Sequence, residues 1–388
     1  MKIKFLAMAA IAAMTTISFT SCSNDDDASA NAQKAGILNS DGKIGYNVTQ
    51  DGAVGTRGIA TTAENFLSRI NDFQVLGYYT DGSGKYVGDV STPAAGIVID
   101  GDGTGNWGYH TASELQYWPS GNLDFQAITP SADASFALAN TVDEGHPRLT
   151  ANVTVPTAVA NQKDIMFASA ANVNNAETGA AVGLTFKHAL SQVVFSGKVA
   201  NPTITAVVSE ITVCNVHGAG NVGFRASTTS ISAAATDDPE SNYSVGLIEG
   251  ADAAATTAAR TMTTTEAKNL TNGNGALMMI PQTQTAWTHA APEKAIADAT
   301  GSYLKVKCTV TDNNSGTVLI NDSYVYIPFD LTTVAWEVGK KYTYTLVFGN
   351  GAGGYDENGD PLTNMVPITY TVTAAEDWTP VVGGNIEF

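Results

Sequence analysis

Charged residues are scarce in this sequence, and its few cations are not clustered. Only 14% of the 388 residues are charged, and 19 lysines and arginines against 37 aspartates and glutamates give a formal net charge of -18. Because phosphate binding requires clustered cations, the sequence predicts no nucleic-acid partner. The five histidines are scattered, without the HExxH or HxH spacing of a zinc site. Zinc and nucleic acid are therefore both unsupported.

Cysteine is also rare, with three residues in the chain. Cys308 falls on the apolar side of an alternating segment, residues 304–310, which indicates a buried small side chain. Because an exported chain can form disulfides, a bridge between Cys214 and Cys308 remains possible from the sequence. The third cysteine, Cys22, lies in the N-terminal signal.

No set of catalytic or cofactor-binding residues is legible. Residues 218–223 match GxGxxG, but β-type segments flank them, whereas a dinucleotide site needs a strand before the motif and a helix after it. Residues 82–85 (GSGK) lack the first glycine and the final Ser or Thr of a phosphate loop and indicate a turn. Dispersed triads and glycosidase carboxylates leave no sequence signature. We predict a protein that is not an enzyme and needs no cofactor.

Two aspartate-rich segments partly match calcium loops. Asp100 and Asp102 stand at the first and third positions of such a loop, but the twelfth position is Thr111, which cannot supply the bidentate carboxylate. A second segment, residues 356–360, has its glycine at the wrong position. The sequence predicts no metal site and leaves calcium binding by these two loops open.

What the chain does contain is a series of short β-type segments. Period-two or short apolar runs recur, separated by Gly, Asn, Asp and Pro clusters, and two short segments, residues 61–70 and 264–270, have helical periodicity. The β-type runs are residues 73–78, 123–128, 193–195, 204–208, 211–213, 276–280, 303–310, 324–327, 342–348 and 368–372. This spacing predicts an all-β fold of two consecutive β-sandwich domains, residues 58–183 and 184–388.

The N-terminus has the features of a bacterial lipoprotein signal. Lys2 and Lys4 precede an apolar run, and Cys22 follows the small residues Thr20 and Ser21. We expect residues 1–21 to be the signal peptide and Cys22 to carry lipid. A plain cleaved signal peptide and an uncleaved anchor are the alternatives, although the apolar run is short for a membrane span.

Residues 22–57 follow as a linker and a removable N-terminal strand, and residues 23 to about 40, rich in Ala, Asn, Ser and Asp without periodicity, indicate the extended linker. Its start, SNDDD at residues 23–27, resembles the acidic signal that sends lipoproteins of the Bacteroides group to the outer face of the outer membrane. An acidic, solvated linker is the alternative interpretation. We expect an outer-membrane lipoprotein exposed on the cell surface.

Five sequence segments, in order, resemble the fimbrillin-like (Mfa-like) pilus proteins of the Bacteroides group. They are YWP with LDF at residues 117–125, LTFKHALSQVVF at residues 184–195, MMIPQ at residues 278–282, WEVGKKYTY at residues 336–344, and PIT at residues 367–369 with Trp378. Each is weak alone, and the ordered set spans most of the chain. The resemblance implies sandwiches of the transthyretin-like, Greek-key type, in which Trp118, His188 and Trp336 serve as packing residues.

The resemblance also implies a route of assembly. A lipidated precursor reaches the surface, an arginine-specific protease removes its N-terminal segment, and the vacated groove accepts a strand from another subunit. Arg57 is the first arginine of the chain, lies among small residues and matches the family's cleavage position. An ordinary exposed arginine is the alternative.

The chain contains a candidate for the removable N-terminal strand and a candidate for the strand that one subunit donates to another. Before Arg57, the residues Ile44, Tyr46 and Val48 alternate on one face, as an inserted and removable strand requires. In the tail, residues 379–388, one parity carries Pro380, Val382, Gly384, Ile386 and Phe388, a pattern that suits a donor strand. A last strand folded back on its own domain is the alternative for the tail. Head-to-tail donation does not close, and it therefore grows filaments.

We therefore predict a structural subunit of a cell-surface fimbrium that contributes to adhesion. Its expected partners are other pilus subunits, in a homopolymer or a mixed pilus, the maturation protease, the outer membrane through the lipid, and a host or bacterial surface ligand. One alternative is an anchor subunit that keeps Cys22 and its lipid. Another is a surface glycan-binding lipoprotein that uses Trp107, Tyr117 and Trp118.

Overall fold

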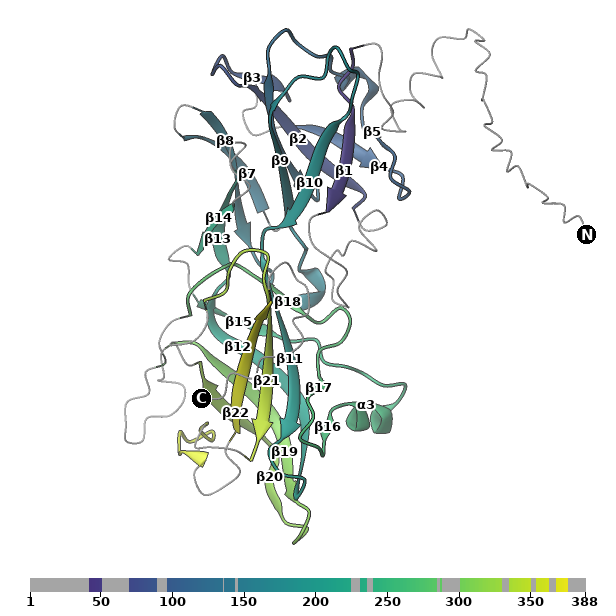
Figure 1. Cartoon of the computed structure of the whole chain (residues 1–388). Helices are drawn as coiled ribbons and strands as arrows, with labels where there is room; N and C mark the ends of the chain where they lie inside the picture. Colours follow the sequence, from purple (N-terminus) through teal and green to yellow (C-terminus); the bar gives the residue numbers. More distant parts are fainter. Residues whose placement is uncertain are drawn as a thin grey trace, which may run out of the picture.

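The computed structural model describes residues 42–50, 70–88, 96–134, 136–143, 146–224, 231–235, 240–284, 287, 301–329, 335–349, 354–362 and 368–375. These residues form several β-sheets stacked along one elongated body (Figure 1), so the predicted all-β fold is confirmed. The predicted site residues Cys22, Arg57, Val382, Ile386 and Phe388 lie outside them. Within the described part of the chain, no helix has both the length and the apolar character needed to cross a membrane.

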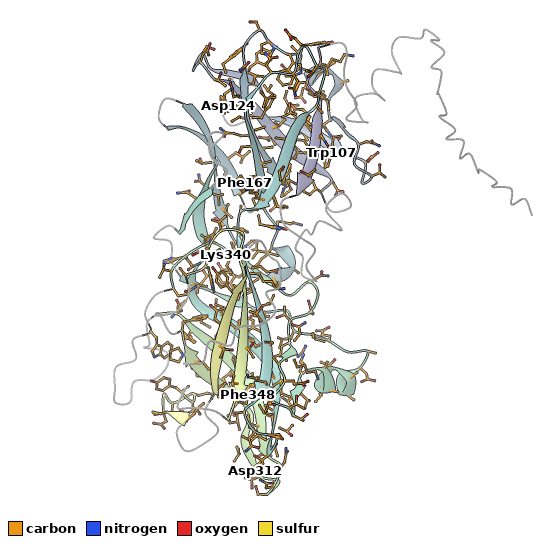
Figure 2. The ribbon with its side chains drawn as sticks, in the orientation of Figure 1. Trp107, Asp124, Phe167, Asp312, Lys340 and Phe348 are labelled. Carbon is orange, nitrogen blue, oxygen red and sulfur yellow. The ribbon has the colours of Figure 1, made fainter. Side chains whose placement is uncertain are left out.

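The upper sheet in Figure 1 has eight strands, in the order β1, β10, β9, β6, β2, β4, β5, with β3 paired to β2. Its strands are β1 (Tyr46–Gln50), β2 (Asp72–Tyr79), β3 (Lys85–Val87), β4 (Ile97–Gly101), β5 (Trp107–Tyr109), β6 (Leu123–Thr129), β9 (Met166–Val173) and β10 (Val182–His188). Neighbours in this sheet are antiparallel, except that β1 runs parallel to β10. One face of the sheet encloses the upper core, in which Trp107 lies (Figure 2).

A four-stranded sheet packs on the other face of the upper sheet. Its order is β14, β13, β8, β7, from β7 (Phe136–Asp143), β8 (His146–Thr154), β13 (Ala219–Phe224) and β14 (Ile231–Ala235). Val153 and Val222 from this sheet share a hydrophobic cluster with Leu76 and Ile128 from the upper sheet. The sheet therefore joins strands from both halves of the sequence.

Two five-stranded sheets form the lower part of the molecule. One contains β11 (Ser191–Val199), β17 (Lys268–Asn269), β18 (Leu277–Met279), β21 (Lys341–Phe348) and β22 (Ile368–Ala375). The other contains β12 (Ile204–His217), β15 (Glu240–Ser244), β16 (Thr261–Met262), β19 (Tyr303–Asp312) and β20 (Val318–Pro328). Their inward side chains, including Phe348 (Figure 2), fill one shared core because strand side chains alternate between faces.

The strand register decides the question of a disulfide. Cys308 is buried on the apolar side of β19, as the alternation predicted. Between β12 and β19, Cys214 pairs with Tyr303 whereas Cys308 pairs with Val208. Five residues of strand separate the two cysteines by about 16 Å, which is too far for a bridge. Both thiols are free and buried, so the bridge that the sequence left open does not form.

One helix prediction is wrong. Residues 264–270 contain β17, which pairs with β11, so tertiary pairing overrides the local periodicity. An unpredicted helix, α3 (Ala253–Ala259), lies nearby in an alanine-rich run, and the Asp252 side chain caps it by accepting a hydrogen bond from the Ala255 N–H. The other predicted helix, residues 61–70, lies outside the described residues apart from Ile70.

The upper and lower parts of the molecule meet between β10 and β11. The expected boundary at residue 184 falls inside β10, whose Leu184 and Phe186 pack in the upper core. At the junction the His188 Nδ1 and Asp164 Oδ1 atoms are 2.9 Å apart, with both side chains buried. A division into two domains stays a prediction, and this strand pairing would place it after His188.

Candidate functional site

The first described strand, β1, closes one side of the upper sheet. It runs beside β10 in Figure 1, with Tyr46 opposite Val182 and Val48 opposite Leu184. The Val182 N–H donates to the Gly45 carbonyl oxygen over 2.7 Å, so the hydrogen-bond ladder extends to the first residue of β10. β1 therefore depends on β10 for its regular backbone pairing.

Residues 42–44, just before β1, are paired on their other side as well. The Ile44 N–H donates to the Gln116 carbonyl oxygen over 2.8 Å, and the Trp118 N–H donates to the Gly42 carbonyl oxygen over 2.7 Å. The hydroxyl of Tyr109, on the far edge strand β5, donates to the Ile44 carbonyl oxygen over 2.8 Å. The sheet is thus curled until its two edges meet, and residues 42–50 fill the gap between β10 and residues 116–118.

The side chains of this segment alternate as the sequence indicated. Ile44, Tyr46 and Val48 are 0%, 2% and 5% exposed, whereas Asn47 and Thr49 are exposed. The three buried side chains belong to the upper core. They therefore act as a row of apolar anchors along one edge of the sheet.

An aromatic chamber receives Tyr46. We define it by five residues: Phe73, Trp107, Tyr109, Trp118 and Phe125. The Tyr46 ring lies 5.9 Å from Phe73, 6.2 Å from Phe125 and 6.2 Å from Tyr109, measured between centroids. Trp107 packs on Phe73 at 5.2 Å, and Trp118 packs edge-on against Phe125 at 5.8 Å. Such contacts add to the free energy of burial, so the chamber is a strong site for a strand side chain.

Residues 57–375 match the model of the fimbrillin-like family. The chain belongs to the fimbrillin-like family. Its family is one of structural fimbrial and adhesion proteins rather than of enzymes. Family membership therefore implies a protein of the cell surface that associates with other fimbrial subunits.

Solved structures similar to this fimbrillin-like chain include candidate cell adhesion proteins of Bacteroides. One, from Bacteroides uniformis, is 16% identical, with 87% of this chain and 100% of that chain covered and a TM-score of 0.45. Another, from Bacteroides ovatus, is 15% identical, with 88% and 98% covered and a TM-score of 0.46. The fimbrial anchor protein Mfa2 from Porphyromonas gingivalis is 10% identical, with 86% and 97% covered and a TM-score of 0.30. No curated protein matches the fimbrillin-like chain.

Three side chains that the resemblance interpreted as packing residues do pack. Trp118 lies against the upper core, and His188 is buried beside Asp164. Trp336 is 2% exposed, and its indole N–H donates to the Tyr344 hydroxyl over 2.9 Å. These contacts stabilise the fold and do not form a ligand site.

The aromatics considered for glycan binding do not share an exposed surface. Trp107 is 3% exposed inside the chamber, and Trp118 packs on Phe125. Tyr117 is 50% exposed. Of the three rings, only Tyr117 is largely exposed, and Trp118 is partly buried.

The motif-like segments of the sequence are turns and strands. Residues 82–85 lie in the turn and strand start between β2 and β3, where the Tyr79 N–H donates to the Gly84 carbonyl oxygen. Residues 219–223 lie in β13, so the GxGxxG segment does not open a helix as a dinucleotide site requires. Neither segment is built to hold a phosphate.

The carboxylate of Asp102 is engaged within its own loop. It accepts hydrogen bonds from the Thr104 N–H and hydroxyl and from the Asn106 N–H and side-chain amide. These bonds lower the pKa of Asp102 far below its usual range. Across the described ranges, no group of three or more His, Cys, Asp or Glu side chains is arranged to hold a metal ion. Hydrogen bonds within the loop therefore account for the position of the Asp102 carboxylate, and no cation is needed to explain it.

Proposed function

We propose that this chain is a structural fimbrial subunit whose β1 is removed by cleavage after Arg57 and replaced by residues 379–388 of another subunit. The observation that carries the proposal is the position of β1. Residues 42–50, which end in β1, fill a gap in which residues 45–50 pair with β10 and residues 42–44 pair with residues 116–118. Ile44, Tyr46 and Val48 of this segment are buried in the upper core. Removal of the segment would leave unpaired backbone groups on two sides and an open apolar groove, which a new strand can fill.

The position of Arg57 supports this removal. Arg57 follows β1 closely in the sequence, and the family match begins at the same residue. Cleavage there would detach β1 from the body while leaving the remaining upper strands in one chain. Lipid on Cys22 would hold the uncleaved precursor at the outer membrane, and an arginine-specific protease would release it into the fimbrium.

The length of the tail favours donation between molecules. β22 ends at Ala375, which pairs with Lys341, and Lys341 pairs with Gln192 near the junction. The 13 residues after Ala375 span about 43 Å when extended. A tail that replaces β1 with the same polarity must enter the groove at the Val182 end of β10, which lies about 33 Å from Gln192. A tail that entered its own groove would use about ten of its residues to reach that end, and only about three would remain to fill the groove. Val382, Ile386 and Phe388 can therefore line the groove together only in another subunit.

The first experiment follows maturation of an Arg57→Ala variant on cells. Its N-terminus should remain at the lipidated Cys22, and detergent-resistant polymers should be absent. The matched control is Arg69→Ala, which changes the next arginine and should mature normally. Normal polymers from Arg57→Ala would overturn the proposal.

A second experiment separates cleavage from strand donation. Deletion of residues 379–388 should allow cleavage after Arg57 but stop polymer growth. A mature wild-type protein in fimbriae that still begins at Cys22 would instead identify a lipid-retaining anchor subunit.

A further inference from the structure

The aromatic chamber contains three buried polar atoms that have no hydrogen-bond partner among the described residues. They are the Tyr46 hydroxyl, the Trp107 indole N–H and the Trp118 indole N–H. All three residues belong to or pack on the upper core. Buried polar atoms are normally paired, so this cluster marks an imperfect fit between the chamber and its present occupant.

Tyr46 is the member of this set that β1 itself brings into the chamber. The neighbouring Tyr109 hydroxyl interacts with it and, second to burial, contributes to the raised pKa of Tyr46, but the Tyr46 hydroxyl makes no hydrogen bond of standard geometry. The Tyr109 proton is donated to the Ile44 carbonyl oxygen. Burial raises the pKa of Tyr46 well above its ordinary value, so the hydroxyl stays neutral. When the strand is released, the hydroxyl can form hydrogen bonds with water. While it is buried and unpaired it lacks these bonds, which favours release.

The two tyrosines therefore act on β1 in opposite directions. The Tyr109 hydroxyl holds the strand through the Ile44 carbonyl oxygen, whereas the Tyr46 hydroxyl favours its release. Their rings are neighbours in one chamber, although Tyr109 is less deeply buried than Tyr46.

We infer that Tyr46 makes β1 a replaceable occupant of the groove, which a strand with an apolar side chain at the same position displaces. The inference rests on the proposed function, in which β1 leaves after cleavage. The tail fits the requirement, because Val382, Ile386 and Phe388 share one parity and carry no hydroxyl. Tyr46 thus speeds the release of β1 in strand exchange.

The test compares two Tyr→Phe changes. The purified uncleaved precursor is labelled at its N-terminus and cut with an arginine-specific protease, and release of the N-terminal fragment is followed over time. Tyr46→Phe should release the fragment about ten-fold more slowly than the wild type, because it removes the unpaired hydroxyl. Tyr109→Phe should release it several-fold faster, because it removes the bond to Ile44. Release from Tyr46→Phe at or above the wild-type rate would overturn the inference.

A second readout keeps this inference separate from the proposed function. The melting temperature of the uncleaved upper part should rise in Tyr46→Phe and fall in Tyr109→Phe, whether or not strands are exchanged. A fragment that stays bound in every variant would overturn the proposed function. In that case the melting temperature of Tyr46→Phe still tests whether the Tyr46 hydroxyl destabilises bound β1. A value above that of the wild type would support this role, and a value at or below it would overturn the role.

Discussion

Replacement of Ile44 by alanine tests whether residues 42–50, the segment that includes β1, are held in place by their buried side chains. Ile44 is 0% exposed, and its backbone N–H and carbonyl oxygen bond to Gln116 and Tyr109. The substitution keeps these backbone bonds and removes only packing. Loss of a large aliphatic side chain from a core costs about 2 to 4 kcal/mol. We therefore expect the upper part of the uncleaved precursor to unfold at clearly lower urea concentration.

The same free energy should appear in the release of β1. After cleavage the strand is bound without a covalent link, so a loss of about 2 to 4 kcal/mol corresponds to release about 30- to 1,000-fold faster. Tryptophan fluorescence reports unfolding through the chamber, and an N-terminal label reports release. The control is Asn47→Ala on the exposed face of the same strand, which should change stability by less than about 0.5 kcal/mol. Equal effects of the two substitutions would refute the reasoning.

Three further predictions concern residues outside β1. The Asp100 hydrogen bond raises the pKa of His110 above 6.5, so this exposed pair is fully present below pH 6.5 and is lost as the pH rises through the raised pKa. An NMR titration should give a midpoint above 6.5 that falls in Asp100→Asn. Burial raises the pKa values of Cys214 and Cys308 to about 11 and about 12, so a thiol reagent should label them only on unfolding. Trp336→Phe removes a buried indole N–H donor and should destabilise the lower part by about 3 kcal/mol in urea titrations.

Short-range patterns in the sequence were sufficient for much of the fold. Alternation over residues 303–310 and 342–348 corresponds closely to β19 and β21, because one face of each strand is buried and the other is not. β7 and β8 were not predicted, although Ala151 and Val153 of β8 are buried and alternate with the exposed Asn152 and Thr154, because small and polar residues make this alternation weak. A chain with a weak local pattern takes its structure from the strands beside it.

The connection between the upper and lower parts shows a different limit. Residues 184–195 form one continuous segment of the resemblance, but the structure divides them into β10 and β11 on either side of Ala189 and Leu190. The two strands join different sheets and face different cores. Local propensity is the same on both sides of the break, so only the packing partners could reveal it.

For the candidate site, the sequence by itself determined that residues 44–48 have one apolar face, because alternation is a property of neighbouring residues. Only the tertiary structure decided where that face is buried. The parallel register with β10 brings Thr49 and Thr185 together across 136 positions, with their hydroxyls 3.2 Å apart. The curl of the sheet then brings Tyr109 against Ile44. Strand register follows from the fit of side chains to a complete core, and that core exists only once distant segments have assembled.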